Sequence, residues 1–528
     1  MHRWIGAALL FVVTSIGWQA TALACGALRP GESLAPGQSV SNCTGTGRLI
    51  HQADGNIVFY DQAGALWATG TDGRATSTLV MQGDGNLVLY GTDGTAPWHT
   101  GTHGNPGAWL AVQDDGNLVI YSATESVLWA TNRFCRSAPS IGGVKGKMIA
   151  GYQGWFAAPG DGSPVDRWVH WGRGIVSAGN VTFELYPDVR EYPVLFQTNL
   201  ANLGNGSPAR LFSSYSTETV DLHFRWMRDY NIDGAALQRF GSELADPAFK
   251  AFRDSIATKV RSAAEANSRI FYVTYDASGM GADFVQRIQD DWATTIESSL
   301  QLTSSSAYAR ENGKPVVTLW GIGFPDRPGT AEDWTSLITW FKNRGVYVIG
   351  GVPGPWRSGG EHVKPGFQSV FTRLNMISPW TVGGYRTDAD VDSYRNNVLV
   401  PDRDFCAANG IDYQPVAWPG FAWSNWNGGP RNWFPRRQGG LFWRQVYNIA
   451  RSNISTMFIA MFDEYDEGTA IAKAAENSSM IPTDQYFLTL DADGVAVSSD
   501  FYLRLAAAAN RMLKGALPLT PTVPISNF

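Results

Sequence analysis

The sequence predicts a multidomain protein, with an all-β domain at the N-terminus followed by an α/β domain of (β/α)₈ architecture. Two observations lead to this prediction. A nine-residue motif recurs three times in the first 135 residues, with no helical pattern between the copies. After these repeats, apolar strand patterns alternate with amphipathic helix patterns. A chain of 528 residues is also long enough for two or more domains.

Residues 1–24 have the pattern of a secretory signal peptide. Arg3 precedes an apolar stretch over residues 5–17, and Ala22-Leu23-Ala24 resembles a cleavage site. We therefore expect a secreted or extracytoplasmic protein. Cleavage would leave Cys25 first, where a lipid anchor is the alternative to ordinary export, although Leu23 lies one place too late for a bacterial lipobox. No later stretch approaches the ~18 apolar residues of a membrane span.

The chain contains four cysteines, and three of them fall within the first 135 residues. An exported protein is expected to form one disulfide there. Cys43–Cys135 would join the two ends of the N-terminal domain, and Cys25–Cys43 is the competing pairing. Cys406 is expected to be a buried thiol.

The N-terminal domain, residues 25–135, is built from three copies of a Gln-x-Asp-x-Asn-x-Val-x-Tyr motif. The copies lie 30 and then 31 residues apart, and the period of two predicts that the five side chains share one strand face. Such a face offers polar groups to sugar hydroxyls and a valine to the sugar carbons. The candidate sugar-binding residues are Gln52, Asp54, Asn56, Val58, Tyr60, Gln82, Asp84, Asn86, Val88, Tyr90, Gln113, Asp115, Asn117, Val119 and Tyr121.

A linker at residues 136–144 leads into the α/β domain, residues 145–516, and residues 517–528 are expected to form an extended tail. Eight strands are predicted, at 147–156, 234–240, 270–278, 315–324, 346–353, 380–385, 414–421 and 456–464. Helices are predicted at 217–230, 247–267, 281–300, 331–343 and 441–452. Because the carboxyl ends of barrel strands carry the chemistry, the site is expected there.

Four carboxylates follow the last predicted strand: Asp463, Glu464, Asp466 and Glu467. Acids crowded beside a buried strand raise one another's pKa, which suits an acid and base pair acting on a sugar. A solvated loop and a cation site are the alternatives. Aromatic and polar side chains at the other strand ends complete the candidate substrate site, which comprises Tyr152, Trp155, His170, Tyr275, Trp320, Trp356, Trp418 and Asp463.

The repeated motif resembles that of the monocot bulb-type mannose-specific lectins, and all three copies are intact. This resemblance implies a β-prism (β-prism II) of three four-stranded sheets with up to three mannose sites. The alternative is that the repeats have kept the fold and lost the binding.

The second domain resembles glycoside hydrolase family 99 and the family 71/99-like proteins, over residues 145–515. The resemblance is carried by Gly151-Tyr-Gln-Gly-Trp155, by Trp168-Val-His170-Trp171 and by Glu464-Tyr-Asp-Glu467-Gly-Thr. It implies endo-α-mannosidase activity, with Glu467 as the general acid. It also implies that Glu464 acts as the base on the sugar's own 2-hydroxyl, so that the anomeric configuration is retained through a 1,2-anhydro sugar. The chain departs from the family pattern at Asp463 and at Tyr465-Asp466.

Other classes of function lack support in the sequence. The net charge of −6 and the absence of a basic run argue against a nucleic-acid partner. There is no His-Glu-x-x-His element, no zinc-ligand spacing and no Gly-x-Ser-x-Gly element, so we expect no metal and no cofactor.

We therefore expect an exported enzyme that binds mannose-containing glycans and hydrolyses α-mannosidic linkages. Two alternatives stay open. One is a non-catalytic lectin, adhesin or toxin whose barrel binds glycans, and the other is a related hydrolase acting on a xyloside, arabinoside or glucan.

Overall fold

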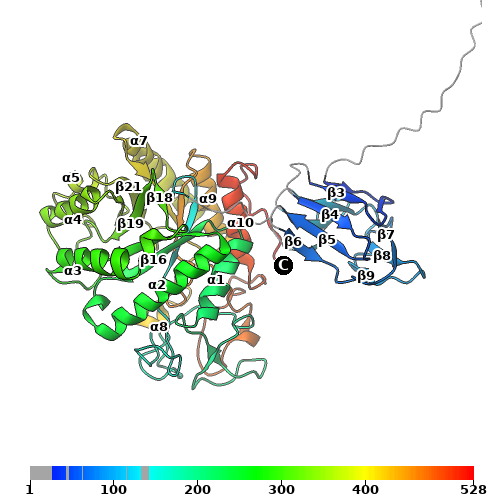
Figure 1. Ribbon diagram of the computed structural model, residues 1–528, viewed down its shortest axis with the longest axis horizontal. Helices are drawn as coiled ribbons and strands as arrows, with labels where there is room; N and C mark the ends of the chain where they lie inside the picture. The colour runs from blue at the N-terminus through cyan, green and yellow to red at the C-terminus, as the bar shows by residue number, and fades with distance from the viewer. Residues whose placement is uncertain (1–25, 43–46, 62–63, 114–115, 132–141) are drawn as a thin grey trace, which may run out of the picture. The chain divides into compact units, whose positions relative to one another are not determined.

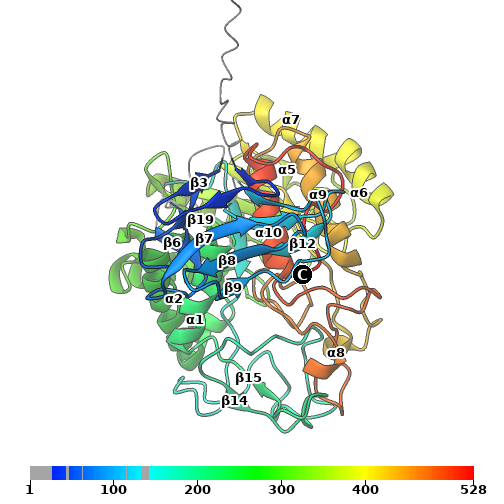
Figure 2. The ribbon, with the colours of Figure 1, turned by 90° about the vertical axis from the view of Figure 1, so that its right-hand side faces the viewer.

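The computed structural model divides into two compact units, residues 1–135 and 136–528 (Figures 1 and 2). It describes residues 26–42, 47–61, 64–113, 116–131 and 142–528. The predicted signal peptide, Cys25, Cys43, Cys135, Asp115 and the start of the predicted linker lie outside the described residues. The expected cleavage and disulfide therefore stay predictions.

The N-terminal unit contains three antiparallel sheets of four strands each. One is formed by β3 (Ser39–Ser41), β4 (Gly47–His51), β5 (Ile57–Asp61) and β6 (Gly64–Ala68). The second is formed by β2 (Ser33–Leu34), β7 (Thr76–Met81), β8 (Leu87–Gly91) and β9 (Trp98–His99). The third is formed by β1 (Ala27–Leu28), β10 (Trp109–Val112), β11 (Leu118–Tyr121) and β12 (Val127–Ala130).

The tryptophans that recur in step with the repeats meet one another in this unit. Trp67, Trp98 and Trp129 form three edge-to-face pairs, with ring centroids 5.5–5.9 Å apart. They pack against a core that includes Phe59 and Leu89, both fully buried. Each sheet therefore contributes one ring to a shared aromatic cluster, and the threefold repetition of the sequence is also present in the packing.

The second unit is organised around a parallel sheet. Its strand order is β22 (Asp412–Tyr413), β21 (Met376–Trp380), β20 (Tyr347–Pro353), β19 (Lys314–Trp320), β17 (Ile270–Asp276), β16 (Gly234–Phe240), β13 (Met148–Tyr152), β24 (Met457–Ile459) and β23 (Val416–Ala417). Neighbours in this order run parallel. The two end strands belong to one segment, residues 412–417, so the curled sheet is consistent with a (β/α)₈ barrel.

Helices follow most of these strands and flank the sheet, and α1 and α2 lie side by side (Figure 1). They are α1 (Thr217–Asp229), α2 (Pro247–Asn267), α3 (Phe284–Asp290), α4 (Ala331–Asn343), α5 (Gln368–Phe371), α6 (Asp388–Tyr394), α7 (Val400–Ala408), α8 (Ser424–Asn427), α9 (Gly440–Ala450) and α10 (Phe501–Leu513). The short strands β14 (Phe196–Gln197) and β15 (Arg210–Leu211) form a separate two-stranded sheet, and the short strand β18 (Arg310–Glu311) pairs antiparallel with β19. Both β14 and β15 lie at the same end of the unit as α8 (Figure 2).

Local sequence explains where the long helices begin. Asp246 accepts hydrogen bonds from the N–H groups of Ala248 and Phe249, and Pro247 occupies the first turn of α2. At α4, Thr330 and Asp333 form a reciprocal capping box. Among the described residues, no helix is long and apolar enough to cross a membrane.

Several predicted strand boundaries were wrong, and two of them matter for the site. The predicted strand 380–385 lies at 376–380, because the run Met376-Ile-Ser-Pro-Trp380 pairs with β20 and the chain turns after it. The last strand ends at Ile459 rather than at Glu464. The tail, residues 517–528, contains no helix or strand, and Arg504 donates to the carbonyls of Ser526 and Asn527.

Candidate active site and sugar-binding sites

A pocket of about 380 Å³ opens at the carboxyl edge of the parallel sheet. Its lining residues lie at or after the ends of β13, β16, β17, β19, β21 and β24, where (β/α)₈ enzymes carry their active sites. They are Gln153, Trp155, His170, Gln238, Phe240, Asp276, Ser278, Trp320, Arg327, Trp380, Trp426, Glu464, Asp466 and Glu467.

The two predicted catalytic acids reach this pocket because the chain turns after β24. The N–H of Thr469 donates to the carbonyl of Glu464 at 3.1 Å, and that of Gly468 donates to the carbonyl of Tyr465 at 3.3 Å. Gly468 has a φ of 63°, in the left-handed region that glycine adopts without strain. On a straight strand, residues three apart face opposite ways. The turn instead lets Glu464 and Glu467 line one pocket.

Asp463 lies behind the pocket and does not line it. Its two carboxylate oxygens accept hydrogen bonds from the backbone N–H groups of Gln153, at 2.7 Å, and Gly154, at 2.9 Å. The side chain is fully buried. Asp463 therefore joins the loop after β24 to the loop after β13 and holds Gln153 at the pocket wall.

Glu464 is held by two neutral donors, one to each carboxylate oxygen. The Gln153 amide donates to Oε1 at 2.5 Å, and the Thr469 hydroxyl donates to Oε2. Hydrogen bonds of this kind favour the ionised form of a carboxyl group. By contrast, no side chain among the described residues donates a hydrogen bond to the carboxyl group of Glu467. The two acids therefore have different surroundings within one pocket.

The acidic cluster is arranged to retain protons. Burial is the first cause that raises the pKa of Glu464, Asp466 and Glu467. The charge of Glu467 further raises the pKa of Glu464, and the charges of Asp466 and Asp276 further raise that of Glu467. Because close carboxylates in a dry site resist full ionisation, the cluster holds at least one proton near neutral pH.

His170 stands at the wall between an indole ring and the acids. Its ring stacks on Trp155 with centroids 3.7 Å apart, and its Nδ1 lies 3.0 Å from Oδ2 of Asp466. Burial lowers the pKa of His170 to about 3, so the imidazole is neutral at physiological pH. A neutral ring can donate or accept one hydrogen bond at Nε2, which suits a ligand hydroxyl.

Several buried polar atoms of the lining residues lack a hydrogen-bond partner among the residues that the structure describes. They are Gln153 Oε1, Trp155 Nε1, Gln238 Oε1, Trp320 Nε1, Arg327 Nε and Asp466 Oδ1. A buried polar group left unpaired costs about 1–3 kcal/mol. Donors and acceptors gathered between indole faces are what a sugar would satisfy, because its hydroxyls pair with polar atoms and its C–H faces pack on rings.

Five predicted substrate-site residues do not line the pocket. Besides Asp463, Tyr152 contacts His223 at 3.0 Å, Tyr275 donates to Asp291 at 2.6 Å and Trp356 donates to Asp402 at 2.7 Å, while Trp418 is fully buried. These side chains serve the interior, which a strand-end position alone does not reveal. Sequence reasoning did not single out Phe240, Ser278, Arg327, Trp380 or Trp426. Phe240 and Ser278 end their predicted strands and so offered a signal, whereas Trp380 stands at the start of its predicted strand.

The first two motifs of the N-terminal unit, residues 52–60 and 82–90, fold as a turn followed by a strand. The expectation that the five side chains share one strand face was wrong. The glycine at the fourth position, Gly55 or Gly85, has a φ of 91° or 94° and turns the chain between Gln and Asn. The turn nevertheless brings the first and last residues together. The Gln amide donates to the Tyr hydroxyl in the pairs Gln52–Tyr60, Gln82–Tyr90 and Gln113–Tyr121, at 2.9, 2.7 and 2.8 Å.

The motif side chains also have structural roles. In the first two copies, the Asp carboxylate accepts from the Asn backbone N–H at 3.0 Å. Asn56 Oδ1 accepts from the hydroxyl of Thr69 at 2.9 Å, and Asn86 Oδ1 accepts from that of Thr100 at 3.1 Å. The Val residues are buried. These contacts give the motif a reason to persist apart from sugar binding.

Among the described residues, no group of three or more His, Cys, Asp or Glu side chains is placed to hold a metal ion.

No protein-family profile matches the chain, and no curated protein matches it. Solved structures do match. The structure of the glycoside hydrolase family 99 endo-α-mannosidase from Bacteroides thetaiotaomicron is 14% identical, with a TM-score of 0.53, over 71% of this chain and 99% of that one.

Monocot mannose-binding lectins match a shorter stretch. The lectin from Gastrodia elata is 38% identical over 20% of this chain and 96% of that one, with a TM-score of 0.19. The snowdrop (Galanthus nivalis) mannose-specific agglutinin is 38% identical over 20% and 94%, with a TM-score of 0.18. The chain thus resembles the monocot mannose-binding lectins in its N-terminal part, and its C-terminal part has a fold like that of the family 99 endo-α-mannosidase.

Proposed function

We propose that the protein is an exported glycoside hydrolase that cleaves α-mannosidic linkages within mannan-type glycans. The observation that carries the proposal is the pair Glu464 and Glu467, which line one pocket but have different surroundings. Indole rings and unpaired buried polar atoms around the pair suit a sugar. The likeness to an endo-α-mannosidase fold, at 14% identity, supports the choice of sugar.

The surroundings of the two acids assign their roles. Two hydrogen bonds favour the anion on Glu464, so this residue is the base. Burial and neighbouring charges raise the pKa of both acids, so the cluster retains a proton. Because Glu464 has the two donors that favour its anion, we assign this proton to Glu467 as the acid. The assignment agrees with the roles that the family 99 resemblance implies.

The reaction then proceeds in two steps. Glu464 takes the proton of the sugar 2-hydroxyl while that oxygen attacks C1, the glycosidic C1–O bond breaks, and Glu467 protonates the leaving oxygen. This gives a 1,2-anhydro sugar. Water then attacks C1, its proton passes to Glu467, and Glu464 returns its proton to the 2-oxygen. Two inversions at C1 retain the configuration.

The test is the release of sugars from α-mannan and a panel of other glycans by the wild type, by Glu464→Gln, by Glu467→Gln and by the control Glu332→Gln. Glu332 is an exposed acid in the first turn of α4. We expect fragments from the wild type and the control, a loss of at least about 10³-fold in each catalytic variant, and a retained anomer by NMR.

Mannan that is bound but never cleaved would overturn the assignment in favour of a binding protein. Release from another glycan alone would keep the mechanism and discard the mannoside. Full activity of Glu467→Gln on substrates with poor leaving groups would remove Glu467 from its role.

We further propose that the N-terminal unit is a β-prism that binds mannose-containing glycans on the same chain as the active site. Several weak sites on one chain raise the local concentration of a polymeric substrate. Its test is Tyr→Phe at Tyr60, Tyr90 and Tyr121 together, which removes each phenol and keeps each ring. Loss of one hydrogen bond per site, about 1 kcal/mol, predicts about fivefold weaker mannose binding by calorimetry. Unaltered binding would show that these hydroxyls are not ligands.

A further inference from the structure

We infer that a second pocket, at the same edge of the sheet, binds sugar units of the same glycan chain away from the bond that is cleaved. This inference rests on the proposed function and specifies the substrate as an oligosaccharide or polymer bound at internal positions. The pocket has a volume of about 800 Å³, in the range of ligand sites. It lies at and beyond the ends of β19, β20 and β21, next to the candidate active site.

The two pockets are continuous in their walls. Trp380, the last residue of β21, lines both. Trp320 of the first pocket contacts Trp380 edge to face, with centroids 5.5 Å apart, and stacks on Phe324 of the second at 4.9 Å. A ligand seated against Glu467 can therefore extend along a row of three rings into the second pocket.

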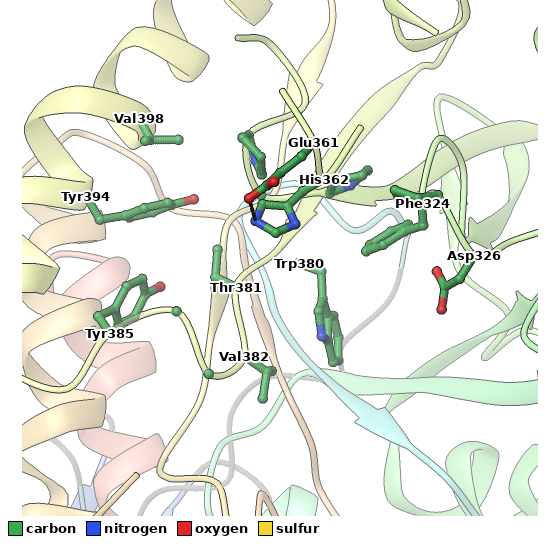
Figure 3. Close-up of a pocket in the computed structure, with 16 residues that line it drawn as sticks. Phe324, Asp326, Glu361, His362, Trp380, Thr381, Val382, Tyr385, Tyr394 and Val398 are labelled. Atoms are coloured by element: carbon green, nitrogen blue, oxygen red, sulfur yellow. Dashed lines mark ion pairs between the residues drawn. The ribbon is translucent and has the colours of Figure 1, made fainter. Parts of the chain in front are cut away.

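The walls of the second pocket present flat rings from different elements. Figure 3 shows Phe324 and Trp380 on one side and Tyr385 and Tyr394 on the other. The two tyrosine rings lie 5.2 Å apart. Val382 and Val398 add apolar surface without filling the space. Rings flanking an open pocket suit pyranose units, which present apolar C–H faces to aromatic side chains.

Charge at the rim favours a neutral ligand. Asp326 pairs with Arg327, and Glu361 lies 3.7 Å from His362. The described residues that line the second pocket include no lysine or arginine. A phosphorylated or sulfated glycan would find no cation among the lining residues, whereas a neutral glycan loses little by entering an apolar site.

The test blocks the pocket and varies the length of the glycan. Val398 lines the pocket and is half-buried, and the adjacent Asn397 is exposed and does not line it. Val398→Trp should fill the space, and Asn397→Trp is the matched control. With a graded series of α-manno-oligosaccharides, from disaccharide to octasaccharide, we expect wild-type kcat/KM to rise at least tenfold with length. Val398→Trp should abolish most of this rise, and Asn397→Trp should retain it.

A parallel binding series uses the same substitutions on a Glu467→Gln background, so that it does not depend on turnover. Both Trp variants contain the same N-terminal unit, so a difference between them reports the pocket alone. Val382→Trp serves as a second block if the thermal unfolding of Val398→Trp shows a misfolded protein. Selective loss of affinity for long glycans in the blocked variants supports the inference.

Equal length dependence in the blocked and control variants overturns the inference even if the enzyme cleaves mannan. A wild type that cleaves no glycan overturns the proposed function, and the binding series still decides whether the second pocket holds sugar.

Discussion

The pH dependence of turnover should respond to Asp466, a carboxyl that stands beside the proposed acid and is itself not required for proton transfer. The substitution Asp466→Asn removes a negative charge and keeps the size of the side chain. The amide oxygen can still accept from His170, so that ring should stay in place. The variant therefore isolates the electrostatic effect of Asp466 on Glu467.

The sign and size of the effect follow from the surroundings of Glu467. After burial, the charge of Asp466 is the next cause that raises its pKa. Two unit charges on neighbouring residues interact by about 2 kcal/mol at an effective dielectric constant of about 20, which is about 1.5 pKa units. Because Asp466 is itself partly protonated in this range, we expect a shift of about one unit. Without that charge, Glu467 loses its proton at a lower pH.

The assay is the profile of kcat/KM against pH, from about pH 5 to 10, for the wild type, Asp466→Asn, Asp276→Asn and the control Glu332→Gln. The alkaline limb reports the proton on the free enzyme's acid. In Asp466→Asn, this limb should shift to lower pH by about one unit. In Asp276→Asn the shift should be smaller, because the charge of Asp276 raises the pKa of Glu467 less than that of Asp466 does. The control should show no shift. A limb that stays fixed or moves up in Asp466→Asn would refute Glu467 as the group that carries the proton.

Three further predictions concern stability. Burial lowers the pKa of His223 to about 3, so below pH ~6.5 the unfolded state takes up a proton that the folded state does not. When the pH falls from 7 to 5, the free energy of unfolding, measured with urea, should therefore decrease in the wild type by about 2 kcal/mol more than in His223→Gln. Equal decreases in the two proteins would contradict a buried neutral ring. Asp463→Ala leaves the N–H groups of Gln153 and Gly154 unpaired and should lower stability by about 3 kcal/mol; a loss below half of that would show that water replaces the carboxylate. Trp98→Ala opens the cluster of three indoles and should cost about 3 kcal/mol, measured by thermal unfolding of the N-terminal unit, with Trp98→Phe recovering part of the loss.

The sequence predicted most of the architecture because that part depends on periodic patterns. The three repeats correspond to three sheets of four strands. The contact among Trp67, Trp98 and Trp129, which recur in step with the repeats, was found only in the structure. The alternation of strands and helices matches the observed parallel sheet and its flanking helices. The strand boundaries were less exact, because an apolar run can continue past the end of a regular strand, as Ala460-Met461-Phe462 does after Ile459.

The sequence determined by itself that acids, rings and amides gather at strand ends, and it picked out Glu464 and Glu467 for the pocket that they line. Only the tertiary structure decided which neighbours share that pocket. Asp463 and Glu464 are adjacent, yet Asp463 accepts hydrogen bonds from backbone N–H groups while Glu464 lines the pocket. The turn after the last strand points these successive side chains in different directions. Trp380 and Trp426 reach the site from segments far apart in the chain, a proximity set by sheet closure and loop packing. Periodicity is a local property, whereas a site is a meeting of distant segments, and the contacts that create it are not encoded in any one of them.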